Sequence, residues 1–159
     1  MIGAVNGMAC GGAFYLLGEC DFLVADTTAT FFDPHTTYGM VSAYESVLLA
    51  QRMPYGEVAR MMLMGTAERV SARRAHDIGL VSELTEPGGA AAAALRCAAV
   101  IAGCPAEGVQ GTVRALWAAK ESAVAAGFAQ AGHLVSLGNL PGERQAELFA
   151  GRARDFRTR

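Results

Sequence analysis

The first eighteen residues place a strand, a glycine turn and the start of a helix next to one another, and this constrains the fold more than any other stretch. Residues 2–5 form a short apolar segment with strand character, and Asn6-Gly7 is a turn signal because both residues tolerate positive φ. Gly11 and Gly12 follow, and the apolar residues of 13–18 predict a helix that ends near Gly18. The opening therefore predicts a mixed α/β structure.

The glycine turn is suited to holding an anion. The first N–H groups of a helix have no partner inside the helix, and Gly11 and Gly12 carry no Cβ that would keep a ligand oxygen away. A phosphate, a carboxylate or a developing oxyanion fits such a place. The alternative is a tight packing turn that binds nothing. The chain lacks both Gly-x-x-x-x-Gly-Lys and Gly-x-Gly-x-x-Gly, so we do not predict a diphosphate cradle.

Composition narrows the class of protein. The chain has 159 residues, of which 52% are hydrophobic and 18% charged, enough for the core of one ordinary domain. A net charge of −2 without a basic stripe in the first 130 residues argues against nucleic acid as a partner, and no apolar run reaches membrane-spanning length. The four cysteines show neither metal nor disulfide spacing, and no signal peptide is recognisable, so we expect a cytoplasmic protein.

The elements beyond the glycine turn change in character near residue 86. We expect strands and short helices before it and helices alone after it. Gly127 and Gly132 are expected to interrupt the helical part, and the last helix is expected to extend from Pro141 as far as Phe156. The predicted strands are 21–25, 30–32 and 80–84, the predicted helices are 43–51, 57–64, 72–78, 90–102 and 105–126, and residues 33–39 are a predicted loop.

Several short motifs in a fixed order resemble the crotonase superfamily, the enoyl-CoA hydratase/isomerase family. They cover roughly residues 2–84, and the helical remainder is compatible with the family. The motifs are Ala4-Val5-Asn6-Gly7, Ala9-Cys10-Gly11-Gly12-Ala13, Cys20-Asp21, Val24-Ala25, Thr30-Phe31, Pro34, Gly39, Met64-Gly65, Arg69-Val70-Ser71-Ala72 and Gly79-Leu80-Val81.

The resemblance implies a fold and an assembly. Residues 1–86 would be the C-terminal part of a spiral of ββα turns, and residues 87–159 a helical region that covers the active site or a neighbouring subunit. Such regions support homo-oligomers, here a trimer or a dimer of trimers. Family members carry a further N-terminal portion, somewhat over a third of their length, that nothing in this sequence resembles. We expect a truncated gene product, a mis-assigned start or a processed fragment.

The resemblance also implies a substrate and a role for the glycine turn. Crotonases bind acyl-CoA thioesters, as substrates rather than cofactors, and stabilise an enolate with two backbone N–H groups. Gly12 matches one of these donors and is a predicted catalytic residue, and Ala9, Cys10 and Gly11 are predicted to contact substrate. The second donor would come from the N-terminal portion, so this chain would hold half an oxyanion hole. We predict no further cofactor and no metal ligands.

The acid–base positions depart from the family's pattern. The two hydratase glutamates correspond to Tyr15 and His35, so two-glutamate hydration is in doubt. His35 is a predicted catalytic residue because imidazole exchanges protons near neutral pH. It could instead bond a backbone carbonyl, and contact with Asp33 depends on the loop. Tyr15, Tyr44 and Glu45 are predicted substrate-binding residues, although Tyr15 also suits helix packing.

Two functions therefore remain open. The first is an enoyl-CoA hydratase/isomerase-like enzyme of fatty acid metabolism that acts on an acyl-CoA thioester through an enolate. The second is a truncated, inactive crotonase-fold chain that binds a partner or only oligomerises. An exposed sheet edge and apolar faces would favour association in the second case.

Overall fold

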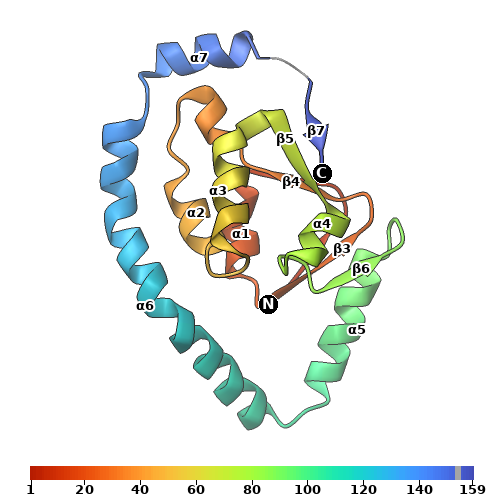
Figure 1. Cartoon of the computed structure of the whole chain (residues 1–159). Coiled ribbons are helices and arrows are strands. Elements are labelled where there is room, and N and C mark those ends of the chain that lie inside the picture. The colour runs from red at the N-terminus through yellow and green to blue at the C-terminus, as the bar shows by residue number, and fades with distance from the viewer. Residues whose placement is uncertain (153–154) are drawn as a thin grey trace.

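The computed structural model describes residues 1–152 and 155–159. Figure 1 shows β-strands and short helices gathered together, with α5, α6 and α7 running around their periphery. The elements are, in order, β1 Ile2–Val5, β2 Met8–Cys10, α1 Ala13–Glu19, β3 Phe22–Asp26, β4 Thr30–Phe32, η1 His35–Tyr38, α2 Ala43–Leu49, α3 Tyr55–Met64, η2 Gly65–Ala67, β5 Glu68–Ser71, α4 Ala72–Asp77, β6 Glu83–Thr85, α5 Ala90–Ala102, α6 Ala106–Gly138, α7 Gly142–Ala150 and β7 Arg157–Thr158.

The strands form two small sheets. In the first, the order is β1-β3-β6 and both pairings are parallel, with Ile2 opposite Phe22 and Val24 opposite Glu83. In the second, the order is β2-β4-β5-β7, where β4 and β5 are antiparallel and the outer pairs are parallel. This mixed α/β architecture confirms the predicted fold class.

The central strand β3 explains how the core is divided. Its apolar run is buried on both faces, as expected for a parallel strand covered from two sides. Leu23 and Ala25 point into the main core with Phe14 and Phe31, whereas Val24 points to the other face and packs with Ala93 of α5. The alanine-rich start of α5 suits this place, because small side chains let a helix lie close against a sheet.

The long helix α6 corrects one prediction. It runs unbroken for 33 residues, so Gly127 and Gly132 do not interrupt it. A Cβ on Gly127 would lie 2.6 Å from Cγ2 of Val47, and one on Gly132 would lie 3.5 Å from the hydroxyl oxygen of Tyr44. These glycines allow α6 to approach α2 closely, and such a packing role has no signal in the local sequence.

The C-terminus corrects a second prediction. Helix α7 ends at Ala150 instead of reaching Phe156, and the chain finishes in the short strand β7. The backbone of Arg159 extends this pairing: its N–H donates to the carbonyl of Arg69 at 3.0 Å, and its carbonyl accepts from the N–H of Ser71 at 2.8 Å. A partner strand distant in sequence thus sets the conformation.

Two further strands, β2 and β5, were not predicted, and β6 begins later than expected. β5 is hard to recognise because it contains the polar residue Glu68, which is buried against Arg60 and Arg159. Among the described residues no single helix has the length and apolar character of a membrane span; α5 and α6 would reach it only together, and they meet at a 116° bend.

Candidate active site

The glycine turn between β2 and α1 leaves one backbone donor free. Gly11 adopts a left-handed φ of 48°, and its N–H donates to the carbonyl of Phe32 at 3.3 Å. Gly12 has an ordinary φ of −54° and is exposed, and its N–H has no hydrogen-bond partner among the described residues. Because α1 has only seven residues, any attraction for an anion comes from such free N–H groups more than from a helix dipole.

The loop after β4 brings His35 against this turn. A Cβ on Gly11 would lie 3.5 Å from Cε1 of His35 and 3.3 Å from Cδ of Pro34. Asp33, fully buried, accepts the backbone N–H of His35 at 3.0 Å, which closes a turn around Pro34. Its two carboxylate oxygens lie 3.0 and 3.1 Å from Nδ1 of the same imidazole. Asp33 therefore orients His35, which sequence reasoning had left to the loop geometry.

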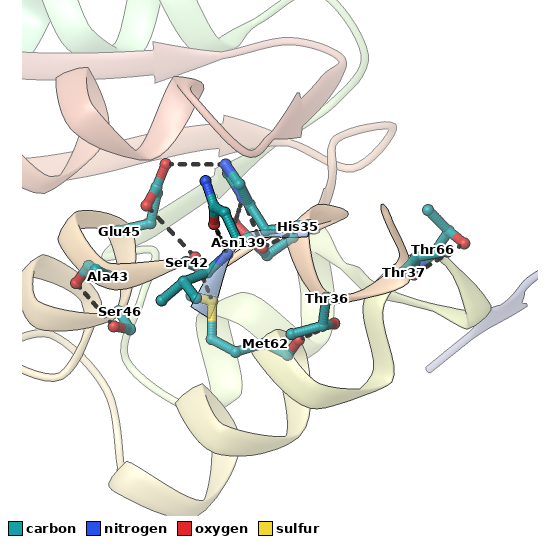
Figure 2. Close-up of polar contacts among 12 residues, drawn as sticks. His35, Thr36, Thr37, Ser42, Ala43, Glu45, Ser46, Met62, Thr66 and Asn139 are labelled. Carbon is teal, nitrogen blue, oxygen red and sulfur yellow. Dashed lines mark hydrogen bonds and ion pairs between the residues drawn. The ribbon is translucent and has the colours of Figure 1, made fainter. Parts of the chain in front are cut away.

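A second carboxylate faces the other side of the ring. Figure 2 shows Glu45 of α2 and His35 pointing toward one another, and Oε1 of Glu45 lies 3.6 Å from Nε2 of His35. Glu45 is 1% exposed, and its Oε1 has no hydrogen-bond partner among the described residues. Its Oε2 accepts the hydroxyl of Ser42 at 3.4 Å, and that hydroxyl also lies 3.2 Å from Sδ of Met62.

The imidazole is therefore held between two buried carboxylates. The hydrogen bond with Asp33, together with the charges of Asp33 and Glu45, raises the pKa of His35 above its ordinary value, and burial opposes this only in part. His35 is 21% exposed, whereas both carboxylates are buried. Of the three groups, the imidazole is the one that a ligand can reach.

Tyr15, in the first turn of α1, lies beside Gly12. A Cβ on Gly12 would lie 3.8 Å from Cδ2 of the Tyr15 ring. Tyr15 is 45% exposed, and its pKa is raised by burial of part of the ring and then by the charge of Glu45. The two glycines are thus each flanked by a ring, Gly11 by His35 and Gly12 by Tyr15, and Glu45 lies near both rings.

The other predicted contact residues have varied positions. Tyr44 packs between α1 and α6, with its ring centroid 6.2 Å from that of Tyr15 and 5.3 Å from that of Phe128. Ala9 is buried in the main core, so its side chain is not available to a ligand. Cys10 is a partly buried free thiol. The structure thus brings Gly12, His35, Tyr15 and Glu45 together, whereas Tyr44 and Ala9 pack against other side chains.

The arrangement also bears on metal binding. The sequence spacing gave no metal-binding pattern, yet Asp33, His35 and Glu45 each offer one ligand atom, all within 4.8 Å of one another. The two carboxylates contact different nitrogens of one ring. A cation on Nε2 would meet only Glu45, and Asp33 would remain an outer partner. Two protein ligands fall short of the three or four of zinc sites, so the geometry favours proton transfer.

Comparison with known proteins defines the class of protein. The family model described as enoyl-CoA hydratase/isomerase matches residues 1–138. The chain therefore belongs to the enoyl-CoA hydratase/isomerase family, within the crotonase superfamily.

Particular relatives show how much of a family member the chain represents. It is 33% identical over 138 residues to the 2,3-dehydroadipyl-CoA hydratase of Escherichia coli K12. The aligned residues are 86% of this chain and 53% of that protein. It is 36% identical over 89 residues to a probable enoyl-CoA hydratase of Rhizobium meliloti, 55% of this chain and 34% of the relative. A similar share, about a third of the relative's length, is matched in three others.

Solved structures agree with this placement. The crystal structure of an enoyl-CoA hydratase from Mycobacterium tuberculosis H37Rv superposes with a TM-score of 0.78 at 33% identity, covering 85% of this chain and 61% of that one. An enoyl-CoA hydratase/isomerase from Mycobacterium paratuberculosis gives a TM-score of 0.82 at 27% identity, covering 94% and 59%.

Proposed function

We propose that this chain acts on an acyl-CoA thioester through an enolate whose oxygen accepts the N–H of Gly12. The observation that carries the proposal is the contact of His35 with the glycine turn. A titratable imidazole lies beside a turn that offers a free backbone donor. Such a donor stabilises negative charge as it develops on a carbonyl oxygen, and the imidazole exchanges the proton.

Family membership supports the substrate class. Relatives named as enoyl-CoA hydratases match in sequence and in structure. The departures at Tyr15 and His35 keep hydration, double-bond isomerisation and another lyase step within the proposal. A homo-oligomer, either a trimer or a dimer of trimers, and a cytoplasmic location are also proposed.

The test compares two substitutions at Gly12. Its φ of −54° suits proline, so Gly12→Pro removes the N–H at little local backbone cost, whereas Gly12→Ala keeps the N–H and adds a Cβ 3.8 Å from Tyr15. Turnover of crotonyl-CoA is followed by loss of the conjugated thioester absorbance. Loss of one oxyanion donor costs about 10²–10³ in kcat, so the alanine variant should exceed the proline variant by about that factor. Equal turnover of the two folded variants would refute the role of the Gly12 N–H.

A non-catalytic role is the second candidate, in which the chain binds a partner or only oligomerises. An apolar groove of about 1140 Å³ lies between the start of the chain and the helices α5 and α6, lined in part by Ile2, Phe22, Leu95 and Leu116. β1 is also an edge strand, paired only with β3 among the described residues. A wild-type chain that neither binds nor turns over crotonyl-CoA, and that sediments as an oligomer, would favour this reading; a soluble monomer at working concentration would count against it.

A further inference from the structure

We propose that the outer edge of β5 is a peptide-docking site, that residues 155–159 of this chain occupy it, and that their docking positions Asp33 and His35. Residues 155–159 form the C-terminal tail. The docking is independent of any reaction, whereas its effect on turnover rests on the proposed function. Arg159 of the tail and Arg69 of β5 are then positioning residues, because they act on the candidate active site through other residues.

Arg159 fixes the tail through both its backbone and its side chain. Figure 1 shows β7 lying along β5, and the N–H of Arg159 donates to the carbonyl of Arg69 at 3.0 Å while its carbonyl accepts the N–H of Ser71 at 2.8 Å. Its Nε lies 2.7 Å from Oε2 of Glu68, and its Nη1 lies 2.5 Å from Oε2 of Glu57. The β5 edge therefore recognises an extended peptide by main-chain hydrogen bonds and an arginine by two carboxylates.

The two carboxylates keep other partners when the tail is released. Glu68 accepts hydrogen bonds from Nε and Nη2 of Arg60, both at 2.7 Å. Glu57 pairs through Oε1 with Nη2 of Arg74 at 2.7 Å. Arg159 thus lies in the middle of an alternating row of five charges, and its departure leaves two complete ion pairs. Because a buried carboxylate left without a partner is strongly destabilising, this arrangement allows the site to exist without its occupant.

Docking of the tail also has a cost that keeps it reversible. Nη2 of Arg159 and Nε of Arg69 are buried without a hydrogen-bond partner among the described residues. Each of these atoms gives up water on docking and gains no replacement, which offsets part of the favourable contacts. β7 has only two residues, and short elements with few ladder bonds open at low free energy. The tail is therefore expected to exchange between docked and released states.

Arg69 links the tail to the strand that leads into the candidate active site. Its guanidinium carbon lies 3.7 Å from the ring centroid of Phe156 in the tail and 4.7 Å from that of Phe32. Phe32 is the last residue of β4, the strand that pairs with β5. Because a guanidinium stacked between two rings is held by both, release of Phe156 loosens the cation that packs on Phe32.

Phe32 in turn bears on both parts of the candidate active site. Its carbonyl accepts the N–H of Gly11 at 3.3 Å, and the residue that follows it is Asp33, whose carboxylate orients His35. A docked tail therefore fixes the end of β4 and, through it, the glycine turn and the imidazole. Misplacement of a catalytic group by about 1 Å can lower a rate about 10²-fold, so a released tail should slow turnover without closing the binding site.

The first experiment needs no substrate. It uses the whole chain with Arg159→Ala, and the matched control is Arg157→Ala, because Arg157 is an exposed residue of the same tail. Amide hydrogen exchange is followed at Ser71, whose N–H donates to Arg159, and at Ser82, whose N–H bonds to β3. Arg159→Ala should speed exchange at Ser71 by at least about tenfold, leave Ser82 unchanged and move the NMR signals of the His35 ring. The control should leave all three unchanged.

The second experiment adds the tail back as a free peptide. The peptide Asp-Phe-Arg-Thr-Arg, with the sequence of residues 155–159, is titrated into the Arg159→Ala chain. It should slow exchange at Ser71 and return the His35 signals toward wild type in a saturable manner. The same peptide with alanine in place of its last arginine should do neither, and alanine in place of its first arginine should be tolerated. Recovery with a peptide separates docking from a general loss of structure.

Turnover of crotonyl-CoA tests the link to the proposed function. Arg159→Ala should lower kcat by about 10–10² with KM within about threefold of wild type, and the free peptide should restore kcat. Arg157→Ala should match wild type in both constants.

Each outcome decides a separate part of the inference. Unchanged exchange at Ser71 in Arg159→Ala, or no recovery with the peptide, would overturn the docking site. Faster exchange at Ser71 with unmoved His35 signals and unchanged kcat would overturn the positioning role. A wild-type chain that does not turn over crotonyl-CoA fails the proposed function, and the exchange and NMR results then still decide this inference.

Discussion

The loop that carries His35 should depend on a contact with the segment between α6 and α7, and Gly39→Ala tests this. Gly39 has a left-handed φ of 68°, and a Cβ there would lie 2.7 Å from Cγ of Leu140 and closer still to its Cδ1. The backbone of Leu140 is fixed to the same place, since its N–H donates to the carbonyl of Gly39 at 2.8 Å. Leu140 therefore cannot move aside freely.

Two costs add for this substitution. A left-handed conformation costs an L-residue about 1–2 kcal/mol, and forcing an extra methyl into a filled space costs about 1–3 kcal/mol. We therefore expect Gly39→Ala to lower the free energy of unfolding by about 2–5 kcal/mol. The matched control is Gly88→Ala, because Gly88 has a φ of 81° but no atom within 4 Å of its Cβ position. The control should lose only the backbone part, about 1–2 kcal/mol.

The assay is urea denaturation of the two variants and of Gly39→Ala combined with Leu140→Ala. Truncating Leu140 should relieve the steric part, so the two substitutions should be coupled by about 1–3 kcal/mol in a double-mutant cycle. Equal destabilisation by Gly39→Ala and Gly88→Ala, with no coupling to Leu140, would refute the reasoning. It would mean that the segment between α6 and α7 does not lie on the His35 loop in solution.

Three further predictions concern stability. Folding raises the pKa of His35, so the stability that the charged ring contributes is complete below the unfolded pKa of about 6.5 and is lost as pH rises through the folded pKa. His35→Asn should therefore lower the free energy of unfolding, measured by urea denaturation, more at pH 6 than at pH 9. Phe31→Ala, at a fully buried ring, should cost about 3–5 kcal/mol, against a few tenths for Leu63→Ala, which is 75% exposed; equal losses would contradict the assigned core. Arg159→Gln should lower the free energy of unfolding by about 1–3 kcal/mol, because it breaks the ion pairs of Arg159 with partly buried Glu57 and buried Glu68. Thermal unfolding measures this loss, and the control Arg157→Gln, at an exposed residue, should stay within about 0.5 kcal/mol of wild type.

Much of the fold could be predicted because its signals are local. The strand before Asn6-Gly7 and the helix after Gly12 both follow from the conformational preferences of single residues. The strand β7 and the continuity of α6 at Gly127 could not be predicted in this way. Both depend on a partner distant in the chain, β5 for the first and Val47 for the second.

The candidate site was predicted only in part, because some of its residues carry local signals and others meet only through tertiary packing. The motif order pointed to Gly12 and His35, and Asp33 lies near enough in sequence to be considered. The position of Glu45 relative to His35 has no local signal, because it depends on how α2 packs between α1 and α6. Ser42, whose hydroxyl contacts both Glu45 and Met62, was not predicted for the same reason.

The sequence by itself determined the family, the mixed α/β class and the glycine turn with its free donor at Gly12. These depend on residue types at fixed spacing along the chain. Only the tertiary structure decided which groups surround that turn. It enclosed the imidazole of His35 between two carboxylates next to the turn, since α2 and the loop after β4 meet only when the core is packed. Burial then sets their proton chemistry, because the cost of isolating a charge from water depends on the assembled surroundings and not on the residue alone.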